Sequence, residues 1–132
     1  NKVVFKNRSK NFEDHINLYK DIDICLDTFP YTGVTTTCEA LWMNVPVISL
    51  AGFNFNSRCG ESILINSNLK DLVAKNKDDY ISKVVSLAND IDKLKKIRKF
   101  IFDEVLKTNT FNTKKFADKF WESILDTYTN HK

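Results

Sequence analysis

Three consecutive threonines, Thr35, Thr36 and Thr37, follow Gly33 in a loop between an apolar run and an apolar helical pattern. Hydroxyl groups and free backbone amides at the start of a helix are donors that bind phosphate and other anions. A glycine at this point lets a ligand approach the main chain, because it has no side chain. The spacing therefore predicts a phosphate-binding loop made of Gly33 and the three threonines.

The same residues also match a helix-capping motif. Thr36 and Glu39 have the Ser/Thr-x-x-Glu spacing of a capping box, in which a hydroxyl and a carboxylate bond free amides at a helix start. This motif accounts for Thr36 and Glu39 but not for Thr35, Thr37 or Gly33, so both interpretations stay open. If phosphate binds here, Glu39 is also an acceptor for a ribose hydroxyl. GxGxxG and GxxxxGK[ST] motifs are absent, so ordinary dinucleotide binding and Mg-assisted NTP hydrolysis are not supported.

Other residues are candidates for the same site. Asp27 ends the apolar run before the loop, and Ser57 and Arg58 stand at a second loop-to-helix junction, after the next apolar run. Ligand sites gather at such junctions in parallel sheets, although helix capping and a surface ion pair explain Ser57 and Arg58 equally well. His15 is either structural or a ligand contact. With His131 as the only other histidine, we expect no metal site.

The threonine loop needs a strand before it and a helix after it, and the hydropathy pattern predicts both. Strands and helices alternate, which favours parallel strands and an α/β fold. We expect one domain over residues 1–132, with a helical layer over about residues 90–130. Short β-branched or apolar runs predict strands at Val3 to Phe5, Ile22 to Leu26, Val47 to Leu50 and Leu72 to Ala74. Helical spacing predicts helices at Phe12 to Lys20 after the cap Asn11, from Thr36, from Ser57 to Ile65, from Asp78 or Asp79, at Ile91 to Lys107 after the cap Asp90, and at Thr113 to Thr129.

The composition restricts the class of protein. A chain of 132 residues with 42% hydrophobic residues is sufficient for one folded core. The net charge of +3 neither requires nucleic acid nor excludes a nucleotide, and we expect the basic run Lys93 to Lys99 to be a solvated helix face. Three cysteines without CxxC spacing suggest neither disulfides nor zinc, which is consistent with a cytoplasmic location. No apolar run approaches the roughly 20 residues of a membrane span.

The stretch from Asp27 to Met43 resembles the C-terminal catalytic half of the O-linked N-acetylglucosaminyltransferase and SPINDLY family of glycosyltransferases. The resemblance extends from His15, through Ser57-Arg58-Cys59-Gly60, to Phe111-Asn112-Thr113. It implies a Rossmann-like parallel sheet, which would be the C-terminal, donor-binding half of a GT-B fold. In that fold two Rossmann-like domains face a cleft, so we expect the N-terminal half upstream of this sequence.

The resemblance also implies roles for residues. Thr35 and Thr36 would contact the diphosphate of a nucleotide sugar, Glu39 would bind the ribose, and His15 would lie near the base. Gly33, Val34 and Thr37 complete the donor-binding set. Val34 stands where the animal enzymes have histidine.

The implied activity is inverting transfer of N-acetylglucosamine or another sugar, from a donor such as UDP-GlcNAc, to a protein hydroxyl without a metal or other cofactor. We expect the missing N-terminal half, with or without helical repeats, to activate the acceptor, so no catalytic residue is assigned in this chain. Two alternatives remain: a nucleotide-binding or protein-interaction module without transfer activity, and a GT-B epimerase. Phe12, at a position that is lysine in the animal enzymes, favours the module, and the intact threonine run favours the transferase.

Overall fold

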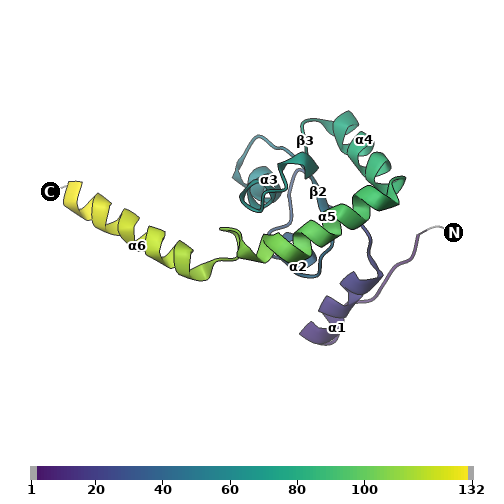
Figure 1. The fold of residues 1–132 in the computed structure, drawn as a ribbon, viewed down its shortest axis with the longest axis horizontal. Coiled ribbons are helices and arrows are strands. Elements are labelled where there is room, and N and C mark those ends of the chain that lie inside the picture. The colour runs from purple at the N-terminus through teal and green to yellow at the C-terminus, as the bar shows by residue number, and fades with distance from the viewer. Residues whose placement is uncertain (1–2, 131–132) are drawn as a thin grey trace.

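The computed structural model describes residues 3–130, and the prediction for His131 lies outside this range. Its centre is a parallel sheet of three short strands in the order β1-β2-β3, of which β2 and β3 are labelled in Figure 1. The strands are β1 (Cys25–Leu26), β2 (Val47–Leu50) and β3 (Val73–Ala74). Cys25 lies opposite Val47, and Ser49 lies opposite Val73. All three strands therefore end at the same edge of the sheet, and the predicted α/β class with parallel strands is confirmed.

Helices connect and cover these strands. Helix α2 joins β1 to β2, helix α3 and the short 3₁₀ helix η2 join β2 to β3, and α2, α3 and α4 all contact β2. This is the alternation that the hydropathy pattern predicted. The remaining bounds are α1 (Phe12–Asn17), η1 (Leu18–Asp21), α2 (Thr35–Trp42), α3 (Phe55–Asn66), η2 (Lys70–Leu72), α4 (Lys77–Ala88), α5 (Ile91–Glu104), η3 (Val105–Lys107) and α6 (Thr113–Asn130).

Local capping contacts fix where several helices begin. The side chains of Asn11 and Asp90 each accept a hydrogen bond of 2.8 Å from the backbone amide three residues later, so both predicted caps are confirmed. Helix α4 begins slightly earlier than predicted, because Asn76 caps it and accepts from the Asp79 amide at 2.9 Å. Asp78 and Asp79 lie in its first turn, where carboxylates interact favourably with the helix dipole.

The strand predicted at Val3 to Phe5 is wrong. This segment has no regular secondary structure and pairs with none of the three strands, and its residues are between 69% and 92% exposed. A strand gains its stability from ladder hydrogen bonds and cross-strand packing, and this segment has neither within the described residues. The apolar run alone therefore did not determine the secondary structure.

Helices α2 and α3 end in the same way. Asn44 and Asn68 follow them with φ angles of 60° and 59°, in the left-handed region that asparagine tolerates better than most residues. The next residues, Val45 and Leu69, are buried, and their amides bond carbonyls in the last turns of the two helices at 2.8 Å. Each asparagine thus reverses the chain and directs an apolar residue into the core.

The core lies between the sheet and helices α2 to α5. Ile48 of β2 and Leu41 of α2 are fully buried at its centre, and Ile101 of α5 and Val105 of η3 close it from the C-terminal side. The partly buried side chains of Ile97 and Leu94 extend the α5 face that packs against this core.

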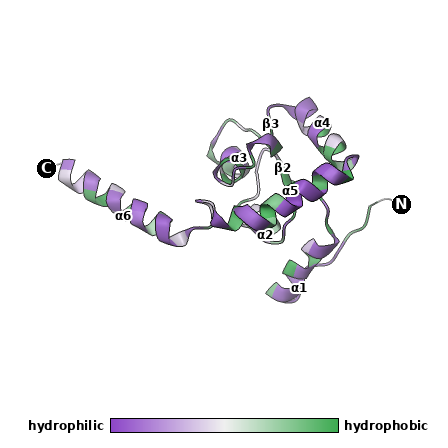
Figure 2. Cartoon of the chain, in the orientation of Figure 1, coloured by the Kyte–Doolittle hydropathy of each residue, from purple (hydrophilic) through white to green (hydrophobic). Residues whose placement is uncertain are grey.

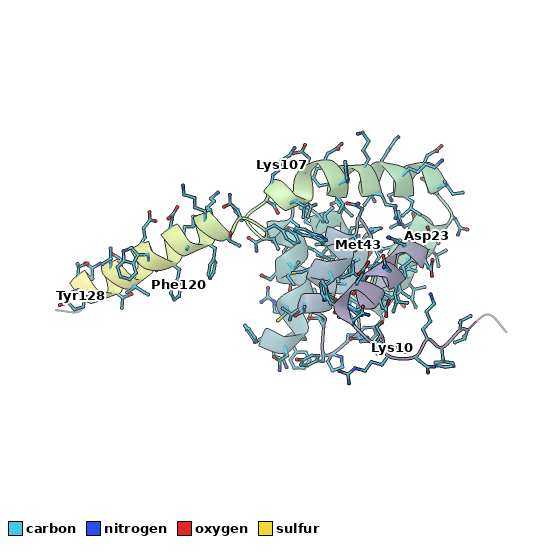
Figure 3. The ribbon with its side chains drawn as sticks, turned by 90° about the horizontal axis from the view of Figure 1, so that it is seen from below. Lys10, Asp23, Met43, Lys107, Phe120 and Tyr128 are labelled. Atoms are coloured by element: carbon cyan, nitrogen blue, oxygen red, sulfur yellow. The ribbon has the colours of Figure 1, made fainter. Side chains whose placement is uncertain are left out.

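Helix α6 extends away from this core in both Figure 1 and Figure 3. It has no buried residue, and apolar and polar positions alternate along it in Figure 2. The helices predicted after residue 90 are therefore present, and their grouping with the sheet in one domain stays a prediction. The exposed apolar side chains of α6 are Phe116, Phe120, Trp121, Ile124, Leu125 and Tyr128.

Candidate functional site

Asp27 follows β1 directly and holds the loop that leads to α2. Its side chain is buried, with Oδ1 accepting from the Gly33 amide at 2.7 Å and Oδ2 accepting from the Ser49 hydroxyl at 2.6 Å. A Cβ atom on Gly60 would collide with Asp27 and Ser49, so α3 approaches this carboxylate as closely as its backbone allows. The predicted candidate Asp27 thus connects the loop, β2 and α3.

Thr32 makes a second attachment of the same loop, which sequence reasoning missed. Its amide and its hydroxyl both donate to the Asn56 carbonyl, at 3.2 and 3.0 Å, and the hydroxyl accepts from the Gly60 amide at 3.1 Å. These partners lie 24 and 28 residues later in the chain, so no local pattern could have indicated them. The loop is therefore fixed to the first turns of α3.

The start of α2 carries the predicted phosphate donors. Val34 occupies the N-cap position and makes no side-chain cap, while the side chains of Thr35 and Thr36 are exposed and that of Thr37 is buried. A Cβ atom on Gly33 would lie 2.5 Å from the Thr36 hydroxyl oxygen and 2.8 Å from that of Thr37. A larger residue at this position would therefore force the threonine hydroxyls to move, so Gly33 lets the first turn of α2 lie close to the main chain of the loop.

The predicted capping box is wrong, because Glu39 bonds to the N-terminal helix instead. Glu39 Oε2 lies 2.9 Å from Nε2 of His15 and accepts from the Tyr19 hydroxyl at 3.2 Å. Helix α2 begins at Thr35 rather than Thr36, so Glu39 lies more than one turn beyond its start. Burial first, and then the charge of Glu39, raise the pKa of Tyr19 well above its usual range.

A pocket of about 360 Å³ lies beside Glu39. Its walls are almost entirely apolar, and the rings of Trp42 and Phe111 at one side have centroids 6.3 Å apart. Thr35 and Glu39 contribute its polar atoms. The structure therefore brings Thr35 and Glu39 to the wall of one apolar slot, and His15 contacts Glu39 beside it. The lining residues are Phe12, Ile16, Thr35, Cys38, Glu39, Trp42 and Phe111.

Ser57 takes part in capping α3, but as its third residue rather than as the predicted N-cap, which is Asn54, and Arg58 forms the expected ion pair. Helix α3 begins at Phe55, and the buried Ser57 hydroxyl accepts from the amides of Phe53 and Asn54 at 2.9 and 3.0 Å. Arg58 Nε lies 2.9 Å from a carboxylate oxygen of Glu61. A ligand contact by Ser57 or Arg58 stays a prediction, as do the ligand roles of the other candidates.

The three cysteines are free thiols, and burial is the main cause that raises the pKa of Cys25 and Cys38. Within residues 3–130, no three His, Cys, Asp or Glu side chains are grouped so that they could hold a metal ion. In the same range, no helix combines the length and the apolar character needed to cross a bilayer.

Comparison with known proteins places this geometry in a family. The chain is 43% identical over 104 residues to the probable UDP-N-acetylglucosamine–peptide N-acetylglucosaminyltransferase SPINDLY of Arabidopsis thaliana, which covers 79% of this chain and 11% of that protein. It is 29% identical over 116 residues to the UDP-N-acetylglucosamine–peptide N-acetylglucosaminyltransferase of Caenorhabditis elegans, with 88% and 10% covered. The chain thus spans about a tenth of the length of these relatives.

A solved structure gives the same result. A mutant of the Thermobaculum terrenum O-GlcNAc transferase superposes with a TM-score of 0.74 and 33% sequence identity, over 87% of this chain and 21% of that one. The family model for glycosyl transferase family 41 matches residues 1–120. The resemblance found in the sequence is therefore confirmed, and the chain belongs to glycosyl transferase family 41.

Proposed function

We propose that this chain is the nucleotide-sugar-binding half of an inverting glycosyltransferase that modifies proteins. The observation that carries the proposal is the start of α2, where no side chain caps the helix and Thr35 and Thr36 are exposed. Family membership supports it, since the relatives are named as peptide N-acetylglucosaminyltransferases that use UDP-N-acetylglucosamine.

Each part of the donor has a proposed partner in this geometry. The first amides of α2 and the hydroxyls of Thr35 and Thr36 bind the diphosphate, because a helix N-terminus attracts negative charge. Glu39 accepts a hydrogen bond from a ribose hydroxyl. His15, whose Nε2 contacts Glu39, lies on the side of the base. The apolar slot beside Glu39 receives the less polar part of the nucleoside.

The proposed mechanism follows the movement of charge. The acceptor oxygen attacks the anomeric carbon while the bond from that carbon to the diphosphate oxygen breaks, and the configuration inverts. Negative charge grows on the departing diphosphate, and fixed donors at the start of α2 stabilise it. Each donor in such a site contributes about 2.7–4 kcal/mol. We therefore propose that the reaction uses no metal or other cofactor.

The rest of the reaction requires parts of the protein beyond this chain. A protein acceptor, an upstream GT-B half that activates it, and helical repeats that present it are proposed partners. The match covers only 11% and 10% of the two relatives, so each relative is long enough to contain all of these parts. A cytoplasmic site of action is part of the same proposal.

The test is a threonine substitution in the full-length protein. Thr36→Val removes one hydroxyl donor while keeping the shape of the side chain. Binding of UDP or GDP, measured by calorimetry, should weaken about tenfold or more, because a hydrogen bond to a charged group contributes about 1.5–3 kcal/mol. Sugar transfer should fall with it.

The matched control is Thr127→Val in α6, whose hydroxyl donates only to a carbonyl one turn earlier. It should leave nucleotide affinity unchanged. If neither UDP nor GDP binds the unmodified protein, the donor site is refuted, and if Thr36→Val behaves like the control, the threonine does not contact the diphosphate.

One observation favours a second candidate, a binding module without transfer activity. Val34 and Phe12 present apolar side chains at the site, and these are 50% and 71% exposed. Incubation of the full-length protein with a panel of nucleotide sugars separates the candidates. A transferase labels a protein acceptor, an epimerase converts the sugar without an acceptor, and a binding module does neither.

A further inference from the structure

Tyr19 lies beneath the first turns of α2 and connects η1 to the candidate site. Its side chain is 7% exposed and belongs to the core. The hydroxyl lies 3.2 Å from Oε2 of Glu39 and 3.4 Å from the carbonyl oxygen of Thr36. The ring packs edge-on against His15, with centroids 5.7 Å apart and an angle of 86° between the planes. Tyr19 is therefore in contact with both predicted nucleoside-binding residues.

The two contacts of Glu39 have a consequence for its carboxylate. An ionised carboxylate only accepts hydrogen bonds, so the Tyr19 hydroxyl and a protonated Nε2 of His15 both donate to the same oxygen, Oε2. This leaves Oε1 for a ligand. The Glu39 side chain is 16% exposed, so it lies at the surface of the pocket with its rotation restricted from the buried side.

We infer that Tyr19 is a positioning residue that holds the Glu39 carboxylate in the orientation in which it accepts a ribose hydroxyl of the nucleotide. This rests on the proposed function. A tyrosine that served only the core could have its hydroxyl satisfied by any backbone carbonyl, whereas this one approaches the carboxylate more closely than the Thr36 carbonyl. The phenol hydroxyl of a tyrosine is protonated at physiological pH and so acts as a donor here; burial and the charge of Glu39 raise the pKa of Tyr19 further.

The test compares Tyr19→Phe with the unmodified protein, using UDP and 2′,3′-dideoxy-UDP, which lacks both ribose hydroxyls. Tyr19→Phe should weaken UDP binding about fivefold to tenfold, the loss expected for about 1 kcal/mol or slightly more. It should leave the affinity for the dideoxy nucleotide unchanged. If GDP is the nucleotide that binds, GDP and 2′,3′-dideoxy-GDP replace this pair.

Tyr80→Phe is the matched control. It removes another partly buried tyrosine hydroxyl, which donates to the Asp27 carbonyl at 2.9 Å and does not contact Glu39. It should not change the ratio of the two affinities. If Tyr19→Phe lowered the affinity for both nucleotides equally, its effect would be a general structural one. If it left the affinity for UDP unchanged, the hydroxyl would have no effect on binding. Either result overturns the inference.

A measurement without ligand separates this inference from the proposed function. Three-bond scalar couplings that report the χ1 angle of Glu39 should indicate one rotamer in the unmodified protein and rotamer averaging in Tyr19→Phe. If no nucleotide binds but the averaging appears, the proposed function fails while Tyr19 still positions Glu39. A single rotamer in both proteins refutes the positioning role.

Discussion

At the scale of single residues, one carboxylate fixes the candidate phosphate loop. Asp27 accepts from the Gly33 amide and the Ser49 hydroxyl, while its carbonyl accepts from the Tyr80 hydroxyl at 2.9 Å. These donors come from the loop, from β2 and from α4. The loop is thus attached to the sheet through a residue that has little contact with solvent.

Asp27→Ala should lower the free energy of unfolding by about 2–3 kcal/mol, because the partly buried Gly33 amide and the buried Ser49 hydroxyl lose their acceptor. Urea denaturation followed by circular dichroism measures this loss. Asp27→Asn should cost clearly less, since its side-chain oxygen still accepts from Gly33 and the Ser49 hydroxyl can rotate to accept from the new amide. If both variants lost the same free energy of unfolding, these hydrogen bonds would not be the source of the stabilisation by Asp27.

The sequence identified most residues of the candidate site but not their partners. The threonines and Glu39 were predicted from local spacing, which is visible along the chain. The contacts of Glu39 with His15 and Tyr19 span 24 and 20 residues, and they replaced the local capping box. Thr32 was missed for the same reason. Contacts made by folding, rather than by neighbours in sequence, decided where these side chains point.

At the scale of elements, α2 has different chemistry at its two ends. Its start has no side-chain cap and faces the candidate site. Its end has a complete set of backbone contacts: Asn44 adopts φ 60°, and the Val45 amide bonds the Ala40 carbonyl at 2.8 Å. The end of α2 is thus anchored in the core by backbone contacts, while its start has no side-chain cap.

Asn44→Ala should lower the free energy of unfolding by about 1 kcal/mol, because alanine tolerates the left-handed conformation less well. Thermal or urea denaturation checks this. Asn89→Ala is a suitable comparison, since Asn89 also ends a helix but has a φ of −94°. Its substitution should cost less. If Asn89→Ala proves as costly as Asn44→Ala, the backbone conformation is not the cause.

Helices and strands could be predicted from the sequence where the contacts that fix them are local. Asn11 and Asp90 bond amides only three residues away, so the caps could be located from the sequence. Pairing of a strand is not local, and the Val3 to Phe5 run has no partner strand among the described residues. Ser57 shows the intermediate case, because it takes part in a cap, but as the third residue of α3 rather than its N-cap.

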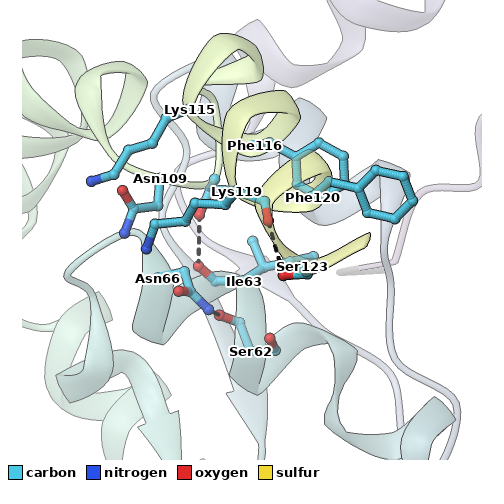
Figure 4. A pocket seen from close by; sticks show the side chains of 10 residues that line it. Ser62, Ile63, Asn66, Asn109, Lys115, Phe116, Lys119, Phe120 and Ser123 are labelled. Atoms are coloured by element: carbon cyan, nitrogen blue, oxygen red, sulfur yellow. Dashed lines mark hydrogen bonds between the residues drawn. The ribbon is translucent and has the colours of Figure 1, made fainter. Parts of the chain in front are cut away.

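At the scale of the whole molecule, α6 stands apart from the core. The link to it is anchored by Thr110, whose hydroxyl oxygen lies 2.9 Å from that of Ser67. A groove of about 540 Å³ lies between α3 and the start of α6, with the Lys115 and Lys119 side chains on one side and the Phe116 and Phe120 rings on the other (Figure 4). Beyond this groove the apolar stripe of α6 is exposed.

Removal of α6, by ending the chain after Asn112, should change the melting temperature by less than about 4 °C, since no residue of α6 is buried. Differential scanning calorimetry measures this change. Binding of a hydrophobic dye such as ANS should fall in the same variant, because the exposed aromatic side chains are removed. A large drop in melting temperature would show that α6 packs on the core.

Periodicity predicted α6 as a helix with one apolar face, but it could not show the direction in which the helix leaves the core. Leu94, Ile97 and Ile101 of α5 have a similar apolar spacing, and they pack on the core. The same apolar spacing therefore belongs to a helix that packs on the core, α5, and to a helix with no buried residue, α6. The position of the preceding turn, which Thr110 anchors, distinguishes them.

The double attachment of the loop between β1 and α2 also affects the thermodynamics of binding. Asp27 ties it to the sheet, and Thr32 ties it to α3. A nucleotide bound at the start of α2 would therefore meet a backbone that is already ordered. The loss of conformational entropy on binding would be confined largely to a few exposed side chains, such as Thr35 and Thr36, and more of the interaction free energy would appear as affinity.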